Sequence, residues 1–222
     1  VLLNQIKSMA FERSKKSISK INNFSLTLSK REAVKADGMF KSSYNLEFLG
    51  LKEDVLEHKL ESSLNENLKN VILELGYGFC FVGNQYRLTL GKNEYYLDLL
   101  FYHRFLKSLV AVELKTGRFK PEYAGKMDFY LNLLNEKEKA KDDNPSIGLI
   151  LCAERDRLEV EFALKTKTNP IGVAAYQLYK NLPTRLRGKL PTAMQIMNKL
   201  EERNRAEEIM ASLSEDMKIR EL

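Results

Sequence analysis

Two strongly apolar stretches in the middle of the chain, residues 94–103 and 108–115, dominate its pattern of hydrophobic and polar positions. Both have the length of strands, and both are apolar nearly throughout, which is typical of strands buried on two faces. We therefore expect them to pair as a hairpin in the centre of a sheet. Charged residues interrupt both stretches: Asp98 lies in the first, and Glu113 and Lys115 lie in the second. Side chains two residues apart project from one face of a strand, which predicts that Glu113 and Lys115 lie together beside Asp98.

Helix and strand patterns follow one another on both sides of this hairpin. Apolar residues at helical spacing predict a long helix over residues 53–75, which ends at Gly76. The other predicted elements, in chain order, are a strand over 79–90 with a bulge at Gly83, a helix over 122–139, a strand over 146–153, a helix over 156–164 and a strand over 170–176. The order α-β-β-β-α-β-α-β predicts an α/β fold in which helices flank a mixed central sheet.

The two ends of the chain have weaker patterns. Residues 2–13 fit a short amphipathic helix, whereas residues 17–41 show no clear element apart from a turn at Asp37-Gly38. After a basic linker bracketed by two prolines, residues 192–218 have the pattern of a polar helix. Such a helix is too polar to fold alone, so we expect it to pack on another protomer. A homodimer through this helix or through the N-terminal arm is therefore expected.

Basic residues gather toward both ends of the chain. The net charge is +6, and the sequence pI is about 9.1. Residues 1–41 hold nine Lys or Arg against three acids, and residues 162–200 hold seven basic residues and no acid. Basic segments on either side of a core favour a polyanion as a partner. A merely solubilising surface is the alternative interpretation.

The composition disfavours several other classes of protein. No apolar run approaches the ~20 residues that span a bilayer, so we expect no membrane segment. Cys80 and Cys152 lie in apolar runs and are expected to be buried thiols of a cytoplasmic protein. The only histidines, His58 and His103, are far apart in the sequence, which disfavours a histidine-based nuclease. No glycine-rich loop followed by Lys-Ser or Lys-Thr is present, which disfavours NTP hydrolysis.

Charged groups inside apolar strands suggest chemistry, because burying an unpaired carboxylate costs several kcal/mol. Magnesium is typically held by one or two carboxylates and keeps several waters. Asp98 and Glu113 would supply carboxylate oxygens, and the backbone carbonyl of Leu114 a further one. In a hydrolysis reaction, Lys115 would orient the attacking water or stabilise the negative charge that develops. The alternative is an ordinary ion pair between Glu113 and Lys115 at a sheet edge.

Four blocks of sequence carry a resemblance to a known family: GYGFCFVGNQYRLTL, YYLDLLFYHR, VELKTGRFKPEYAGKMDFYLN and DDNPSIGLILCAE. Together they resemble the C-terminal nuclease domain of the bacterial YhcG family, a branch of the PD-(D/E)XK nuclease superfamily. The resemblance implies a restriction-endonuclease-like core, α-β-β-β-α-β. It also implies a nuclease domain over residues 44–182, preceded over 1–43 by the end of a helix-turn-helix-like domain whose remainder is missing. Residues 183–222 would be a linker and C-terminal helix.

The family pattern assigns roles to particular residues of this chain. Asp98 and Glu113 match the metal-binding carboxylates, and Lys115 matches the catalytic lysine. A glutamate of the first helix often completes such sites, and Glu61 is its best match. The ion implied is Mg²⁺, for which Mn²⁺ can substitute.

Three further residues are candidates for contacts with nucleic acid or for support of the site. Lys126 and Tyr130 fall where related nucleases place Gln-x-x-x-Tyr, and lysine at the first of these positions departs from that pattern. Gln85, on the first strand, is the third candidate.

These observations predict a metal-dependent nuclease that hydrolyses DNA phosphodiester bonds, and we expect an endonuclease. Two alternatives stay open on sequence alone. The same fold can serve as a non-catalytic nucleic-acid-binding scaffold in a restriction, repair or defence complex. An RNA nuclease would differ only in whether its cleft accepts a 2′-hydroxyl group.

Overall fold

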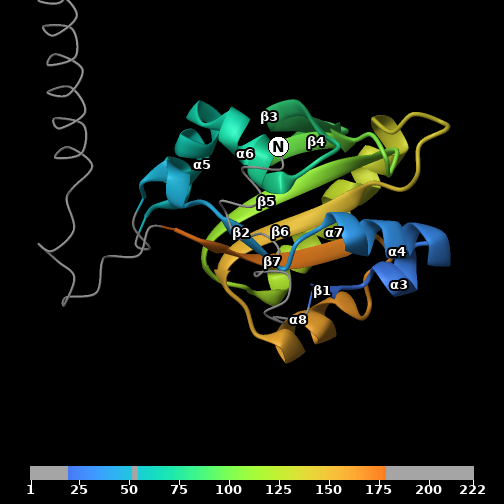
Figure 1. The fold of residues 1–222 in the computed structure, drawn as a ribbon. Helices are drawn as coiled ribbons and strands as arrows, with labels where there is room; N and C mark the ends of the chain where they lie inside the picture. The colour runs from blue at the N-terminus through green and yellow to red at the C-terminus, as the bar shows by residue number, and fades with distance from the viewer. Residues whose placement is uncertain (1–19, 52–54, 179–222) are drawn as a thin grey trace, which may run out of the picture. The chain divides into compact units, whose positions relative to one another are not determined.

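The computed structural model describes residues 20–51 and 55–178 (Figure 1). The helices predicted over residues 2–13 and 192–218 lie outside these ranges. The described elements, in chain order, are β1 (Ile21–Asn22), α3 (Phe24–Thr27), α4 (Lys30–Met39), β2 (Ser43–Asn45), the 3-10 helix η1 (Glu47–Leu49), α5 (Glu57–Glu66), α6 (Leu68–Leu75), β3 (Phe79–Leu90), β4 (Asn93–His103), β5 (Ser108–Arg118), α7 (Pro121–Lys137), β6 (Ile147–Glu154), α8 (Arg157–Leu164) and β7 (Ile171–Gln177).

The strands form one mixed sheet with the order β1-β7-β6-β5-β4-β3, drawn as arrows in Figure 1. Strands β3, β4 and β5 form the expected antiparallel meander, and β5, β6 and β7 are parallel. Two short strands pair with β7: β1 is antiparallel to it, and β2 is parallel. The predicted α/β fold with a mixed sheet flanked by helices is confirmed, and so is the bulge near Gly83, where the β3–β4 register shifts.

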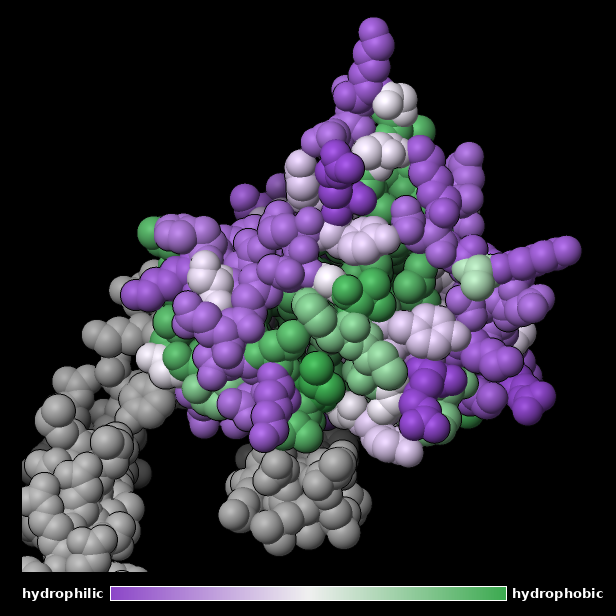
Figure 2. Space-filling model, turned by 90° about the horizontal axis from the view of Figure 1, so that it is seen from above, coloured by the Kyte–Doolittle hydropathy of each residue, from purple (hydrophilic) through white to green (hydrophobic). Residues whose placement is uncertain are grey.

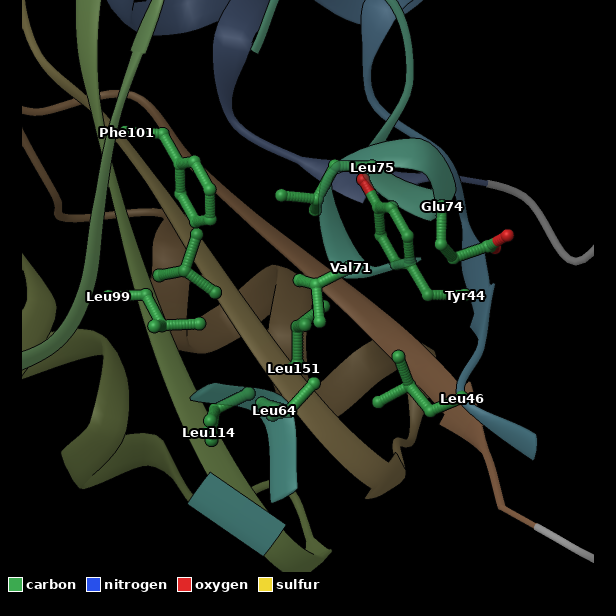
Figure 3. Close-up of a pocket in the computed structure, with 11 residues that line it drawn as sticks. Tyr44, Leu46, Leu64, Val71, Glu74, Leu75, Leu99, Phe101, Leu114 and Leu151 are labelled. Atoms are coloured by element: carbon green, nitrogen blue, oxygen red, sulfur yellow. The ribbon is translucent and has the colours of Figure 1, made fainter. Parts of the chain in front are cut away.

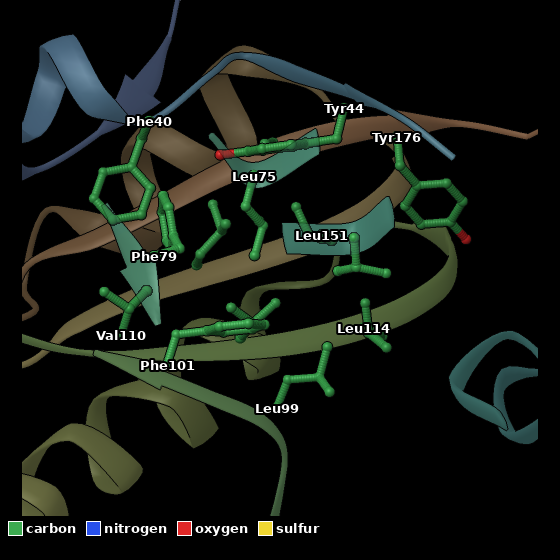
Figure 4. Close-up of a cluster of buried hydrophobic side chains, with 14 of the residues drawn as sticks. Phe40, Tyr44, Leu75, Phe79, Leu99, Phe101, Val110, Leu114, Leu151 and Tyr176 are labelled. Carbon is green, nitrogen blue, oxygen red and sulfur yellow. The ribbon is translucent and has the colours of Figure 1, made fainter. Parts of the chain in front are cut away.

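Each face of the sheet buries its own hydrophobic core. Helices α3 to α6 cover one face and contribute to the cluster in Figure 4, which includes Phe40, Leu75, Phe79, Phe101 and Leu151. Helices α7 and α8 cover the other face, where Met127, Leu131 and Val160 pack on strand residues. Because β5 and β6 lie in the middle of the sheet, most of their side chains are buried. This explains why both strands have almost continuous apolar sequences.

The single helix predicted over residues 53–75 is wrong, because two helices, α5 and α6, meet at Asn67. The backbone of Asn67 has φ −106° and ψ 26°, and its side-chain amide donates a 2.9 Å hydrogen bond to the carbonyl of Ser63. Asparagine competes in this way with helical hydrogen bonding. The apolar stripe continues across the break, so the periodicity alone did not reveal it.

The turn predicted at Asp37-Gly38 is also wrong, because both residues lie inside α4. A capping box starts this helix: Ser29 accepts from the backbone of Glu32, whose side chain accepts from the backbone of Ser29. Ala33 and Ala36 of α4 belong to the same core as the later helices. Residues 20–43, expected as the end of a separate domain, thus pack on the common sheet, and the domain boundaries stay a prediction.

The two cysteines differ in exposure. Cys152 is buried as expected, whereas Cys80 is exposed on β3, which pairs with β4 alone at the edge of the described sheet. Its apolar sequence neighbours suggested burial, but an edge strand leaves part of its surface open. In the part of the chain that the structure describes, no helix has the length and apolar character needed to cross a membrane.

The side of the molecule that carries α5, α6 and β3 has apolar surface between hydrophilic margins (Figure 2). Beneath α6, a narrow pocket lies between the helices and the sheet (Figure 3). Its lining is apolar except for the tyrosine hydroxyl of Tyr44 and the carboxylate of Glu74. Glu74 accepts a 2.8 Å hydrogen bond from the backbone of Asn45 and lies 3.2 Å from the ammonium of Lys41. These contacts give Glu74 a structural role in joining α6 to the segment around β2.

Gly148 of β6 lies directly against the Met127 side chain of helix α7. A Cβ atom there would lie 2.5 Å from Cγ and 2.7 Å from Sδ of the buried Met127. We expect Gly148→Ala to lower the free energy of unfolding by about 1–3 kcal/mol, because the fully buried Met127 side chain must leave its packed position. Urea unfolding measures this. Gly125→Ala in α7 is the control, since its Cβ would meet nothing within 4 Å, and alanine should there raise stability by about 0.5–1 kcal/mol. Equal stability of the Gly148→Ala variant and the wild type would contradict the prediction.

Candidate active site

The predicted site lies where β4 and β5 separate. Their ladder ends at the pair formed by Leu99 and Val112. One residue farther, Asp98 would face Glu113, but the backbone N–H of Leu114 donates a 2.8 Å hydrogen bond to Oδ2 of Asp98 instead. The N–H and C=O of a strand residue point to the same edge. The carbonyl of Leu114 therefore faces the gap in which the Asp98 carboxylate lies.

Glu113 is the most deeply buried charged residue of the site, with an exposed fraction of 2%. Its Oε2 accepts a 2.9 Å hydrogen bond from the ammonium of Lys126 and lies 3.5 Å from that of Lys115. Its Oε1 is buried and has no hydrogen-bond partner among the described residues. Buried carboxylate oxygens are usually paired, so this one has a free lone pair for a ligand.

Lys115 is held from several sides. Its ammonium donates a 2.5 Å hydrogen bond to Oε1 of Glu57 and lies 5.7 Å from the ring centroid of Tyr123. Its backbone carbonyl accepts a 3.2 Å hydrogen bond from the hydroxyl of Tyr176. Burial by itself would lower the pKa of Lys115, but the hydrogen bond that Lys115 donates to Glu57 and the negative charge of Glu113 outweigh it, and the pKa is raised. The lysine is therefore charged at neutral pH.

Glu61 lies one helical turn after Glu57 on α5, but its hydrogen-bond partner is Gln85 and not Lys115. Its Oε1 accepts a hydrogen bond from the side-chain amide of Gln85 on β3. Gln85 has φ +43°, a left-handed conformation uncommon outside glycine. The pairs on either side of Gln85 in the β3–β4 ladder place it across from Asp98. The structure thus joins the two candidates Glu61 and Gln85 to each other, whereas Lys115 binds Glu57.

Glu57 is the site residue that the sequence analysis missed. The family pattern asks for a glutamate on the first helix, and this helix offers two at i and i+4 spacing, which lie on one face. The sequence does not reveal which of the two meets the lysine. The choice depends on where α5 begins and how it crosses β5.

Lys126 and Tyr130 lie one turn apart on α7, as their spacing predicts. The ammonium of Lys126 lies 5.1 Å from the ring centroid of Tyr130. The Tyr130 hydroxyl donates a 3.1 Å hydrogen bond to the carbonyl of Tyr96 on β4, and the residue is buried. Tyr130 therefore links α7 to β4, and Lys126 is the member of this pair that contacts the site.

The surroundings of Asp98 disfavour the charge of its carboxylate. Burial and, to a smaller extent, the negative charge of Glu113 raise the pKa of Asp98 to about 7. The hydrogen bond from Leu114 and the charge of Lys115 act in the opposite direction. For Lys126, burial would lower the pKa, but the charge of Glu113 outweighs this effect and the pKa is raised. The site thus holds more negative charge than its burial favours, which is the condition that attracts a cation.

A divalent cation fits the donor set of this site. Among the described residues, no three His, Cys, Asp or Glu side chains gather at metal-binding distance. Magnesium does not need three, because it commonly takes one or two carboxylates and completes its shell with water. The partnerless Oε1 of Glu113, the carboxylate of Asp98 and the carbonyl of Leu114 are oxygen donors of the preferred kind.

This chain is similar to several known proteins. A relative is the YhcG protein of Escherichia coli (strain K12), 41% identical over 138 residues, which are 62% of this chain and 37% of that protein. The chain thus spans well under half the length of this curated relative. Among solved structures, a repair endonuclease from Pyrococcus abyssi matches with a TM-score of 0.39 and 13% identity, covering 59% of this chain and 49% of that one. The structure of an EndoMS complex with double-stranded DNA matches with a TM-score of 0.39 and 15% identity, covering 60% and 47%.

The family model described as the YhcG PDDEXK nuclease domain matches residues 37–191, which are more than two thirds of the chain. This range contains the four sequence blocks and every residue of the site described above. It confirms the resemblance inferred from those blocks. The chain therefore belongs to the family of the YhcG PDDEXK nuclease domain.

Proposed function

We propose that this nuclease domain hydrolyses phosphodiester bonds of DNA as an endonuclease that depends on a divalent metal ion, Mg²⁺ with Mn²⁺ as a substitute. The observation that carries the proposal is the buried Glu113, whose Oε1 has no partner among the described residues. Asp98 and the fixed ammonium of Lys115 lie next to it. A buried carboxylate with a free oxygen is costly, and a cation would relieve that cost.

Each residue of the site would have a distinct role. Asp98, Glu113 and the carbonyl of Leu114 would hold the ion. When bound, a divalent ion would polarise the phosphate and make water a better nucleophile. Lys115 would direct its ammonium at the negative charge that develops at the phosphate, and Glu57 would hold that ammonium in place.

DNA as the substrate is supported by the charge distribution of the whole chain. The net charge is +6, and the basic residues gather in segments outside the acidic site. Such segments attract a polyanion without reading its sequence.

We also propose the domain arrangement with a nuclease domain over 44–182, the end of a helical domain over 1–43 and a linker and helix over 183–222. A homodimer through either end would bring two sites to the two strands of a duplex.

The test is an incubation of the chain with linear, circular and branched DNA in Mg²⁺, Mn²⁺ or EDTA. We expect cleavage in either metal, including cleavage of the circular substrate, and none in EDTA. Cleavage of linear DNA alone would contradict the endonuclease proposal. Binding without cleavage of any substrate would favour a non-catalytic scaffold. Preferential cleavage of RNA in a parallel reaction would favour an RNA nuclease.

The two glutamates of α5 are expected to contribute unequally. Glu57→Gln removes the charge that holds Lys115, and we expect cleavage to fall by about 10–100-fold, the usual effect of losing a partner that orients a site residue. Glu61→Gln, which alters the contact to Gln85, should have a smaller effect and is the matched variant. Initial rates at saturating Mg²⁺ measure both. A larger loss for Glu61→Gln would assign the supporting role to Glu61, as the sequence predicts.

A further inference from the structure

Two ammonium groups compensate the buried charge of Glu113. Both approach the same oxygen, Oε2: Lys126 at 2.9 Å and Lys115 at 3.5 Å. The other oxygen, Oε1, has no partner among the described residues. Both positive charges thus lie at Oε2 of Glu113, and Oε1 stays available to a ligand.

The two lysines differ in how firmly they are held. The Lys115 side chain is 10% exposed and is anchored by the 2.5 Å bond to Glu57. The Lys126 side chain is 42% exposed. It comes from the surface of α7 on a flexible four-carbon stem. Lys126 can therefore leave Glu113 at a smaller cost in packing than Lys115 can.

We infer that Lys126 is an exchangeable counter-ion that neutralises Glu113 in the absence of metal and gives way when a divalent cation binds. This inference rests on the metal dependence proposed above. A bound ion would bring two positive charges to Glu113 and Asp98, and the nearby ammonium would then be repelled instead of attracted. Metal binding must break the pair between Lys126 and Glu113. The pair therefore lowers the affinity for metal and raises the metal concentration at which the site fills.

The departure from the family pattern at this position fits such a role. A glutamine at position 126, as in related nucleases, could donate a hydrogen bond to Glu113 but would carry no charge to be displaced. Lysine provides both the hydrogen bond and the charge. The same residue that stabilises the metal-free site thus competes with the ion for it.

Titration calorimetry with Mn²⁺ alone, without DNA, tests the inference on the wild type and on Lys126→Gln. We expect the variant to bind Mn²⁺ about tenfold more tightly, within the range usual for coupled binding events. Lys126→Arg keeps the charge and should bind no more tightly than the wild type. Lys137→Gln, on the same helix where Lys137 donates to the carbonyl of Thr89, is the control for a loss of charge elsewhere. It should bind as the wild type does.

Thermal unfolding gives a second measurement that does not depend on activity. In EDTA, Lys126→Gln should unfold at a lower temperature than the wild type, because Glu113 loses a charged partner. In saturating Mn²⁺ this difference should shrink or vanish. Equal Mn²⁺ affinities of wild type and Lys126→Gln would overturn the inference and leave the proposed function intact. Failure of every variant to bind Mn²⁺ would overturn both.

Discussion

Lys115→Met is expected to reduce metal-dependent DNA cleavage by at least about 10²–10³-fold, the usual effect of removing one positioned donor to a developing negative charge. Methionine keeps an unbranched side chain that can pack on Tyr123, so the fold should persist. The variant removes only the ammonium that Glu57 and Glu113 hold at the site. Single-turnover cleavage rates in Mg²⁺ measure the loss, and circular dichroism checks the fold.

Lys92→Met is the control for this variant. Lys92 is exposed in the turn between β3 and β4, so its loss removes one positive charge away from the site. Its cleavage rate should stay within about twofold of the wild-type rate, since an exposed charge is largely screened. A Lys115→Met variant that is folded and cleaves at the wild-type rate would remove Lys115 from the mechanism and leave its ion pairs a structural role.

Asp98→Asn is expected to abolish both Mn²⁺ binding and cleavage while raising the stability of the metal-free protein. The asparagine oxygen can still accept the hydrogen bond from Leu114, so the link between β4 and β5 persists. What is lost is a charge that the fold disfavours, because burial and Glu113 raise the pKa of Asp98 to about 7. Calorimetry with Mn²⁺, cleavage assays and urea unfolding in EDTA measure the three effects.

The stabilisation by Asp98→Asn should depend on pH with a definite sign. A carboxyl whose pKa is raised by folding stabilises the protein when protonated, and that contribution is lost as pH rises through about 7. The variant has no carboxyl at this position and does not lose stability in this way. Its free energy of unfolding relative to the wild type should therefore increase by about 1–3 kcal/mol from about pH 5 to about pH 8, since one pKa unit is worth about 1.4 kcal/mol. Asp37→Asn, which alters an exposed carboxylate, should show no such trend. An advantage that shrinks with rising pH would contradict this electrostatic account.

The order of the central elements followed from the sequence because each has a strong local signal. Strands β4 and β5 are nearly continuous apolar runs, and the apolar residues of α7 recur on one side. Two predictions of secondary structure from the sequence were wrong, because a second local interaction outweighed the pattern on which each was based. Asn67 breaks an apolar stripe that continues across it, and the capping box at Ser29 starts a helix through the supposed turn at Asp37-Gly38.

The sequence by itself determined the family and the two strands that carry Asp98, Glu113 and Lys115. The family follows from the residues of four sequence blocks, and the shared face of Glu113 and Lys115 follows from the two-residue repeat of a strand. Only the tertiary structure decided which partners these charges meet. Glu57 instead of Glu61 reaches Lys115, and Lys126 pairs with Glu113, because these contacts depend on how α5 and α7 cross the sheet. Such crossings join residues more than ten positions apart, and no local pattern specifies them. The free oxygen of Glu113 likewise becomes visible only after every neighbour has been placed.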